Sequence, residues 1–297
     1  MTSDDAHLTK IGFLGLGALG APIAARLAAR NPVAVFDPDP GRRLPDPEGV
    51  AYLASPREVA DHADIIFACL AERQHHQEAL LGSEGIVHGR RRRLYVHLGT
   101  SGSLFLEELD RQLAAAGIAT IDAPVTGGPP KARSGELTTI VSGEPVGVAT
   151  VRDAIMRYSN RIVVAGERPG QAQTLKLVNN AIALTNLVAA CEAMVVGARC
   201  GIDAETMLEV INNGSGQSRV TLSKLPDHVL PRSFDFGATL AVVIKDLELF
   251  LAEPGTRSML TDTCRSALDA FRRARDVSGE HDHLSQAPTP GDVAIDR

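Results

Sequence analysis

The feature that most constrains the fold of this chain is a glycine-rich turn between two short regular segments near the amino terminus. The apolar run KIGFL at 10–14 predicts a strand, and the alanine-rich run APIAARLAAR at 21–30 predicts a helix. They are joined by Gly15-Leu16-Gly17-Ala18-Leu19-Gly20. In such a turn the glycines permit a sharp bend, let a pyrophosphate approach the backbone and let the helix pack closely on the strand. We therefore expect these six residues to bind a dinucleotide at the amino end of the helix.

The acidic residue that a dinucleotide site needs follows at the expected distance. A second apolar run, PVAVF at 32–36, ends in Asp37, which lies 22 residues after Gly15. A carboxylate about 20 residues after the first glycine binds the adenosine ribose hydroxyls, and it repels a 2′-phosphate. This favours NAD over NADP. Arg42 and Arg43 follow within six residues and weaken the preference, so NADP stays open.

Strand-like and helix-like segments continue to alternate up to about residue 165. Strands are predicted at 64–70, 94–98, 118–122, 137–141 and 161–164. Helices are predicted at 55–60, at 104–116 and at 146–158, and a further helix follows the strand at 64–70 and ends at Leu81. This alternation is typical of an α/β fold with a Rossmann-type, doubly wound sheet, which we assign to residues 1–165. Such sheets bind ligands at the carboxyl ends of their strands. We therefore expect Leu70 and Thr100, at the ends of two strands, to contact the cofactor.

A long apolar helix is predicted at 170–200, where the sequence GQAQTLKLVNNAIALTNLVAACEAMVVGARC contains no proline. At about 1.5 Å per residue it can link two domains. Lys176 and Asn180 are four residues apart and so share one face near its start. Taken alone, the two side chains fit a solvated first turn. Further helices are predicted at 203–213, 240–251 and 259–274, which makes residues 166–297 an all-α domain with a disordered tail from about residue 286.

A second polar motif precedes the long helix. The segment DAPVTGGPPKARSGELTTIVSG at 122–143 contains Thr126, Gly127 and Gly128. A hydroxyl beside two unencumbered backbone N–H groups is suited to hold a carboxylate. A structural turn explains the glycines equally well, so both interpretations stay open at this point.

Composition narrows the class of protein. Two domains fit within 297 residues, and the net charge of −6 argues against nucleic-acid or anionic-membrane partners. The four cysteines form no CxxC pair, His75 and His76 fit a solvated helix face, and no metal site is predicted. No run of 18 apolar residues lacks a polar interruption, and the first ten residues contain no apolar signal region. We expect a soluble, cytoplasmic protein.

Together the motifs resemble the β-hydroxyacid dehydrogenase family, which includes 3-hydroxyisobutyrate dehydrogenase, tartronate semialdehyde reductase and glyoxylate or succinic semialdehyde reductases. GLGALG with Pro22 is similar to the family's amino-terminal signature, and DAPVTGG is similar to its substrate loop. GQAQTLKLVNN resembles its catalytic motif, and Lys245-Asp246-Leu247 its carboxyl-terminal block. The resemblance runs from Ile11 to about Ser285 and implies a Rossmann-type domain, a long inter-domain helix and an all-helical domain, assembled as homodimers or homotetramers.

The resemblance also implies residue roles. Lys176 is then the catalytic lysine, Asn180 and the Thr126-Gly127-Gly128 segment hold the substrate carboxylate, and Lys245 lies beside the nicotinamide end of the cofactor. Four positions depart from the pattern: Thr126 stands for serine, Pro129-Pro130-Lys131 for small residues, Ala172 for glycine, and His97-Leu98-Gly99-Thr100 for Asp-x-Ser-Thr.

The function implied is hydride transfer between NAD(P) and a small 3-hydroxy acid or the corresponding semialdehyde or keto acid. Lys176 would act as general acid and base, because an ammonium in a partly closed cleft loses its charge more readily than in water. Two alternatives remain. One is an imine reductase-like enzyme, although that family generally lacks a lysine at this position. The other is a catalytically weak, cofactor-binding regulatory protein.

Overall fold

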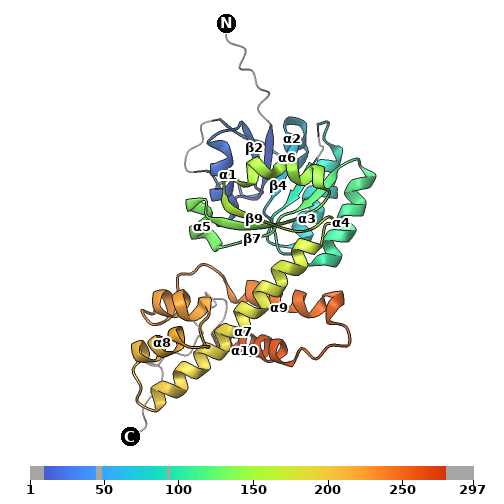
Figure 1. Cartoon of the computed structure of the whole chain (residues 1–297). Coiled ribbons are helices and arrows are strands. Elements are labelled where there is room, and N and C mark those ends of the chain that lie inside the picture. The colour runs from blue at the N-terminus through green and yellow to red at the C-terminus, as the bar shows by residue number, and fades with distance from the viewer. Residues whose placement is uncertain (1–9, 45–48, 92–93, 279–297) are drawn as a thin grey trace. The chain divides into compact units, whose positions relative to one another are not determined.

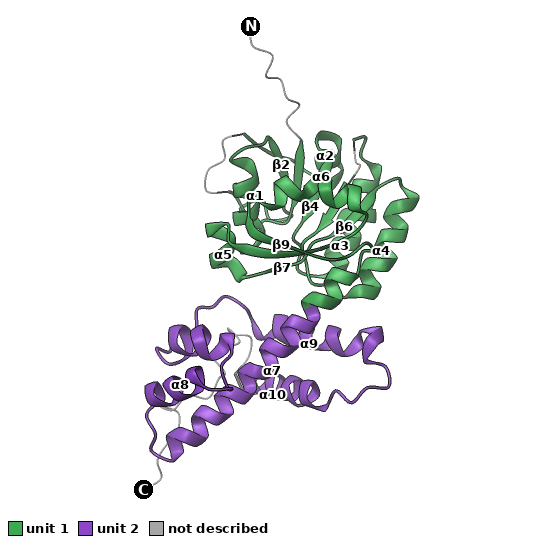
Figure 2. Cartoon of the chain, viewed as in Figure 1, with its two compact units in different colours: residues 1–176 green, residues 177–297 purple. Residues whose placement is uncertain are grey.

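The structure, a computed structural model, describes residues 10–44, 49–91 and 94–278 (Figure 1). The tail from about residue 286, which the sequence predicts to be disordered, lies outside these ranges. The chain divides into two compact units, Met1–Lys176 and Leu177–Arg297, which Figure 2 shows in different colours. The division falls inside one long helix, α7 (Gln171–Arg199).

Unit 1 is built on a twisted sheet whose first six strands are all parallel. These strands follow the order β3-β2-β1-β4-β5-β6, and their bounds are β1 Ile11–Leu14, β2 Val33–Phe36, β3 Val50–Tyr52, β4 Ile65–Ala68, β5 Leu94–His97 and β6 Ala119–Asp122. This order reverses direction at β1, where the neighbouring β4 continues the sheet on the other side. Dinucleotides bind at such a switch point. The predicted α/β, doubly wound fold is confirmed.

The sheet continues beyond β6 in the opposite direction. Strand β8 (Leu137–Ser142) is antiparallel to β6 and to the short β7 (Val125–Thr126), and β9 (Ser159–Gly166) is parallel to β8. The register pairs Asp122 with Ser142, so the end of β6 lies beside the end of β8. This pairing places two polar side chains where the long helix begins.

Helices cover both faces of the sheet because alternate strand residues point to opposite sides. In β4, Ile65 and Phe67 belong to one buried core, and Ile66 and Ala68 belong to the other. The first core contains residues of α1 (Gly20–Ala28), α5 (Gly128–Ser134) and α6 (Pro145–Ile155). The second contains residues of α2 (Pro56–His62), α3 (Arg73–Leu81), η1 (Ile86–His88) and α4 (Ser103–Ala115).

Unit 2 is helical and is organised around the rest of α7. Its elements are α8 (Ala204–Asn213), the π-helix η2 (Val220–Val229), α9 (Leu240–Ala252), the 3-10 turn η3 (Pro254–Thr256) and α10 (Asp262–Ser278). One stripe of α7 enters the core with these helices: Ala181, Leu184, Leu187, Cys191 and Met194. By length and composition alone α7 could cross a membrane, but the core helix of a soluble protein passes the same test.

Several elements differ from the sequence-based predictions, and the short strands β3 and β7 were not predicted. The helix η2 was not predicted, because Pro226 inside it removes a backbone donor and normally interrupts helices. The helix predicted from Met259 begins instead at Asp262, after Ser258 with a φ of 63°. The glycine-proline segment contains the short helix α5, whose prolines fall in its first turn, where N–H groups lack intrahelical acceptors anyway.

Candidate functional site

In the glycine turn after β1, neighbouring atoms leave no room for a side chain on Gly15 or Gly20. Gly15 has a φ of 92°, and a Cβ there would overlap the carbonyl oxygen of Cys69 and lie 2.8 Å from Leu70 Cδ2. A Cβ on Gly20 would overlap the carbonyl oxygen of Gly15, so this glycine is required for helix α1 to approach β1. Gly17 is different, since the nearest atom to its Cβ would be Arg42 Nη1 at 3.6 Å. The open space at Gly17 is where a pyrophosphate can approach the backbone.

Asp37 connects the end of β2 to this turn. Its Oδ2 accepts a 2.6 Å hydrogen bond from the backbone N–H of Leu16, and its Oδ1 accepts one of 2.9 Å from that of Asp39. The Asp37 side chain is only 4% exposed, and Arg42 Nη1 lies 3.4 Å from Oδ2. The predicted ribose-binding carboxylate therefore also fixes the glycine turn. The nearby arginine partly offsets its charge.

Leu70 and Thr100 follow the carboxyl ends of β4 and β5, the same sheet edge as the glycine turn. Leu70 approaches Gly15, as its 2.8 Å distance from the Cβ position shows. Gly99, beside Thr100, faces two histidine rings, since a Cβ there would lie 3.1 Å from His76 Nε2 and 3.2 Å from His97 Nε2. The absence of a side chain at Gly99 therefore makes room for these rings.

The two histidines belong to a buried polar chain that the sequence analysis missed. The Tyr95 hydroxyl lies 2.9 Å from His76 Nδ1 and 3.0 Å from His97 Nδ1, and His97 Nε2 lies 3.2 Å from Ser101 Oγ. The two imidazole centroids are 4.2 Å apart. Burial raises the pKa of Tyr95 well above its usual value, so its hydroxyl stays protonated and can donate to only one of the rings. The other ring must then donate to Tyr95.

The interpretation of His76 as part of a solvated face is wrong, whereas His75 is exposed as expected. Two histidines in succession on a helix point in different directions, and α3 turns the second one towards the sheet. Tyr95 and His97, two residues apart on β5, share one face of that strand. Their alternation with apolar residues was the available signal in the sequence.

The start of α7 is fixed by a buried carboxylate at the end of β6. Oδ2 of Asp122 accepts backbone hydrogen bonds from Gly170 (3.1 Å) and Gln173 (3.0 Å), and Oδ1 accepts one from Gln173 Nε2 (2.7 Å). Ser142 Oγ accepts from the N–H of Ala172 at 3.0 Å and donates to Asp122 at 3.4 Å. The N–H groups of the first helical turn, which have no intrahelical acceptors, are thus bound by side chains from β6 and β8.

Gln173 extends this network to the loop after β5. Its Oε1 accepts from the N–H groups of Ser101 (2.7 Å) and Gly102 (3.1 Å), and its Nε2 also donates to the Gly99 carbonyl oxygen at 3.0 Å. Every bond has one chemically allowed direction, so the amide has one orientation. Sequence reasoning did not select Asp122 or Gln173. Asp122 could have been selected because it begins the DAPVTGG motif, and Gln173 because it lies one helical turn before Lys176.

Lys176 lies one turn after this anchor and is half-buried. It is three residues after Gln173 and four after Ala172, so it shares their face of α7. Helical side chains lean towards the helix amino terminus. Because Ala172 and Gln173 are anchored to β6 and β8, we expect Lys176 to point towards the carboxyl edge of the sheet.

The Thr126–Gly128 segment occupies the turn between β7 and α5. Thr126 is half-buried and is paired with Thr138 of β8, whereas Gly127 and Gly128 have φ values of 131° and 73°. Such values favour glycine at both positions. The geometry satisfies a turn. A Cβ on Gly127 would lie 2.8 Å from Lys131 Cδ, whereas the nearest atom to one on Gly128 would be Pro130 Cδ at 3.8 Å.

Unit 2 brings together the other two predicted site residues through an acid. Asn180 Nδ2 donates to Asp246 Oδ2 at 2.7 Å, and Lys245 Nζ lies 3.1 Å from Asp246 Oδ1. Asp246 is buried, which favours its pairing with both neighbours. Asp246 orients Asn180, a role that the sequence analysis did not assign to it. In the ranges that the structure describes, no three His, Cys, Asp or Glu side chains are grouped to hold a metal ion.

The sheet order and the glycine turn are typical of a protein of the dinucleotide-dependent oxidoreductase class. Residues 10–166 match the family model for the NAD binding domain of 6-phosphogluconate dehydrogenase. Residues 170–288 match the model described as NAD-binding of NADP-dependent 3-hydroxyisobutyrate dehydrogenase. The chain belongs to the β-hydroxyacid dehydrogenase family and contains its NAD-binding domain.

Curated relatives agree with this assignment. L-threonate dehydrogenase of Cupriavidus necator is 30% identical over 81% of this chain and 82% of its own length. A 3-hydroxyisobutyrate dehydrogenase of Pseudomonas aeruginosa is 30% identical over 93% of this chain and 96% of its own.

Solved structures share the fold. A Mycobacterium tuberculosis 3-hydroxyisobutyrate dehydrogenase with L-serine matches with a TM-score of 0.83 and 24% identity, covering 94% of this chain and 98% of that one. An imine reductase from Myxococcus stipitatus in complex with NAD⁺ matches with a TM-score of 0.63 and 18% identity, covering 94% of this chain and 98% of that one. At these identities the likeness concerns the fold alone.

We predict that two alanine substitutions in the glycine turn act differently. Gly20→Ala should lower the free energy of unfolding by about 1–3 kcal/mol, because its Cβ meets a backbone oxygen. Gly17→Ala should leave stability nearly unchanged and weaken NADH binding by about tenfold or more, because the methyl group occupies the approach of the pyrophosphate. Urea unfolding and NADH fluorescence titration measure the two effects. Equal destabilisation by both substitutions would contradict this division of roles.

The buried carboxylate predicts a specific pH dependence of stability. Burial raises the pKa of Asp122 to about 6, although hydrogen bonds from Gln173, Gly170 and Ser142 oppose the rise. A raised pKa in the folded state means that stability present below the unfolded-state pKa is lost as the pH rises through about 6. The free energy of unfolding of the wild type minus that of Asp122→Asn should therefore fall by roughly 2 kcal/mol between pH 4 and pH 7.

Urea unfolding followed by circular dichroism at several pH values measures this difference. Subtraction of the variant removes the contributions of the other carboxylates. A difference that grows with pH would mean that the hydrogen bonds outweigh burial and that the folded-state pKa lies below its usual value.

Proposed function

We propose that this chain is an NAD(P)-dependent dehydrogenase or reductase that acts on a small 3-hydroxy acid or the corresponding semialdehyde or keto acid. The observation that carries the proposal is the anchoring of α7 by Asp122, Ser142 and Gln173. This anchoring aims Lys176 at the sheet edge that also carries the glycine turn. A lysine held there is suited to proton transfer beside a nicotinamide.

Cofactor contacts are assigned to the sheet edge and to one residue of unit 2. Gly15-Leu16-Gly17-Ala18-Leu19-Gly20 face the pyrophosphate, Asp37 the ribose, Leu70 and Thr100 the neighbouring part of the cofactor, and Lys245 its nicotinamide end. The orientation of Asp37 by the Leu16 N–H supports NAD as the preferred cofactor. Arg42 at 3.4 Å is placed to accept NADP with lower preference.

The chemistry divides between cofactor and protein. When bound, the nicotinamide exchanges a hydride with the substrate carbon. In oxidation Lys176 accepts the hydroxyl proton as the carbon loses its hydride. In reduction Lys176 donates that proton to the carbonyl oxygen. The Thr126 hydroxyl, the N–H groups of Gly127 and Gly128, and the Asn180 amide bind the substrate carboxylate, with Asp246 fixing the amide orientation.

The substrate class rests on the relatives and on the Thr126–Gly128 segment. L-Threonate, 3-hydroxyisobutyrate and 2-(hydroxymethyl)glutarate, named in the relatives, are all carboxylates with a hydroxyl group. Imine reductases share the fold, but the lysine at position 176 favours a hydroxy acid. A purely regulatory role is a third possibility, which is supported if the protein turns over none of the tested substrates.

Assembly and location are proposed on other grounds. We assign a homodimer or homotetramer, because apolar side chains of α7 and neighbouring helices in unit 2 are exposed, with Ile182 at 60%, Val196 at 62% and Val210 at 70%. Burial of such side chains is a main driving force of subunit association. Cytoplasmic location is supported by the free cysteines among the described residues.

The first test is a screen of 3-hydroxyisobutyrate, L-serine, glycerate, L-threonate and glyoxylate with NAD(H) and NADP(H). We expect turnover of at least one, faster with NAD(H). On that substrate, Lys176→Ala should lower kcat by about 10²–10⁴-fold, the usual value of positioned proton transfer. The NADH dissociation constant should stay within about twofold, because Lys176 is assigned no cofactor contact.

Lys10→Ala is the matched control, since Lys10 is an exposed lysine before β1. It should retain wild-type kcat. Loss of NADH binding in Lys176→Ala would indicate a structural lysine. Reduction of a cyclic imine without turnover of any hydroxy acid would support the imine reductase alternative, and neither activity would support the regulatory one.

The assembly proposal predicts that the mass of the protein in solution depends on the exposed apolar side chains of α7. Light scattering after size exclusion should give a multiple of the 31.4 kDa chain mass. Ile182→Lys combined with Val196→Lys should shift the protein towards the monomer, because charges replace apolar contacts. Val146→Lys, which changes an exposed valine of α6 in unit 1, should not. A monomeric wild type would refute this assembly.

A further inference from the structure

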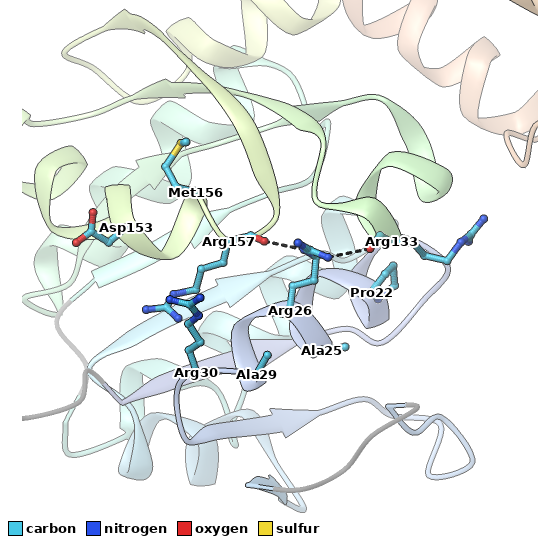
Figure 3. A pocket seen from close by; sticks show the side chains of 9 residues that line it. All are labelled: Pro22, Ala25, Arg26, Ala29, Arg30, Arg133, Asp153, Met156 and Arg157. Carbon is cyan, nitrogen blue, oxygen red and sulfur yellow. Dashed lines mark hydrogen bonds between the residues drawn. The ribbon is translucent and has the colours of Figure 1, made fainter.

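Unit 1 contains a pocket rich in arginine that has no place in the proposed reaction (Figure 3). Its volume is about 770 Å³, within the range of small-molecule sites. It is formed by the outer face of α1 and the residues after it, by the end of α5, and by the end of α6. The lining residues are Pro22, Ala25, Arg26, Ala29, Arg30, Arg133, Asp153, Met156 and Arg157.

One of the four arginines holds the walls of the pocket together. Arg26 Nε donates to the Arg157 carbonyl oxygen at 2.7 Å, and Arg26 Nη1 donates to the Arg133 carbonyl oxygen at 3.0 Å. Figure 3 shows this guanidinium between the two backbone segments. The guanidinium group thus connects α1 to the ends of α5 and α6. The other three arginines also line the pocket, and Figure 3 shows the Arg133 side chain pointing away from Arg30 and Arg157.

These three arginines have no carboxylate partner in the part of the chain that the structure describes. No ion pair within 4 Å involves Arg30, Arg133 or Arg157 there. The Nε and Nη1 atoms of Arg157 are buried and have no acceptor among the described residues. A buried N–H without an acceptor is unfavourable. Both atoms are closed to solvent, so an oxyanion in the pocket would reach them only if the guanidinium group turns.

The helix dipole accounts for part of the cluster. Arg26 and Arg133 lie in the last turns of α1 and α5, where positive charge is favourable because of this dipole. This does not explain the two buried donors of Arg157. Nor does overall composition, because the chain carries a net charge of −6. Asp153 is the one acid among the lining residues, which include four arginines.

We propose that this pocket binds a soluble, phosphate-bearing small molecule, held by Arg30 and Arg157. The fork of a guanidinium group matches the oxygens of a phosphate, and two arginines favour a multiply charged anion. The site is distinct from the cofactor site, because its lining residues on and after α1 run from Pro22 to Arg30 and include none of the glycine turn at 15–20. It also contacts the end of α5, the helix that begins at Gly128.

The test is calorimetric titration of inorganic pyrophosphate into the full chain saturated with NAD, so that the glycine turn is already occupied. We expect one site whose affinity falls with added salt. Arg30→Gln combined with Arg157→Gln should weaken binding by about tenfold or more. Arg30 is exposed and Arg157 is half-buried, so thermal unfolding is measured to show that the double variant folds. Arg152→Gln combined with Arg161→Gln removes two exposed arginines outside the lining and should leave affinity within about twofold.

Two further measurements address the buried donors and a lipid source of the phosphate. Arg157→Gln, with its thermal unfolding measured separately, should also weaken binding, because it removes the buried donors. Vesicles containing phosphatidylglycerol should not sediment the protein, because the site takes a soluble ligand. The proposal is overturned if pyrophosphate does not bind, if both double variants weaken binding equally, or if vesicles bind and pyrophosphate does not.

Discussion

The structure of unit 1 depends on the interaction of one buried carboxylate with the first turn of α7. Asp122 accepts two backbone N–H groups and the amide of Gln173, and Ser142 binds a third backbone N–H. Burial of a charge is costly unless it is bound by donors, and here the donors are the groups that a helix start leaves without acceptors. The cost of burying the Asp122 carboxylate and the cost of leaving the first N–H groups of α7 without acceptors therefore offset each other. The rise of the Asp122 pKa to about 6 shows that the compensation is incomplete.

The same network connects three strand ends with the lysine. Gln173 binds the loop after β5 through Gly99, Ser101 and Gly102, whereas Asp122 and Ser142 stand at the ends of β6 and β8. A shift of any of these strand ends would therefore be transmitted to α7. Since catalytic geometry tolerates displacements of less than about 1 Å, such an anchor is what a proton donor at this position needs.

The buried histidine chain explains two departures from the family pattern. His97 occupies the position of the family's acid, and its ring is bound by Tyr95 and Ser101. A side chain at position 99 would contact the His76 and His97 rings, so glycine at this position leaves room for them. These substitutions form one packing unit. They replace a polar, cofactor-facing strand end by a buried network while leaving Thr100 in place.

Local patterns predicted much of this fold, and long-range pairings were missed. The apolar runs of β1, β4 and β5 and the glycine turn are short-range signals that determine backbone conformation directly, so their prediction succeeded. The bond between Asp122 and Gln173 joins residues 51 apart, and no local pattern indicates it. The burial of His76 likewise depends on Tyr95, which lies on another element. Pro226 concealed η2, because its effect on a helix is normally disruptive.

The most direct test of the central claim is a single-turnover measurement on Gln173→Leu with the best substrate of the screen. Our account predicts that NADH formation slows by about 10²-fold, because Lys176 loses its alignment. The NADH dissociation constant should stay within about twofold, because the glycine turn and Asp37 are untouched. A folded variant that forms NADH at the wild-type rate would contradict the claim that this anchor positions the lysine.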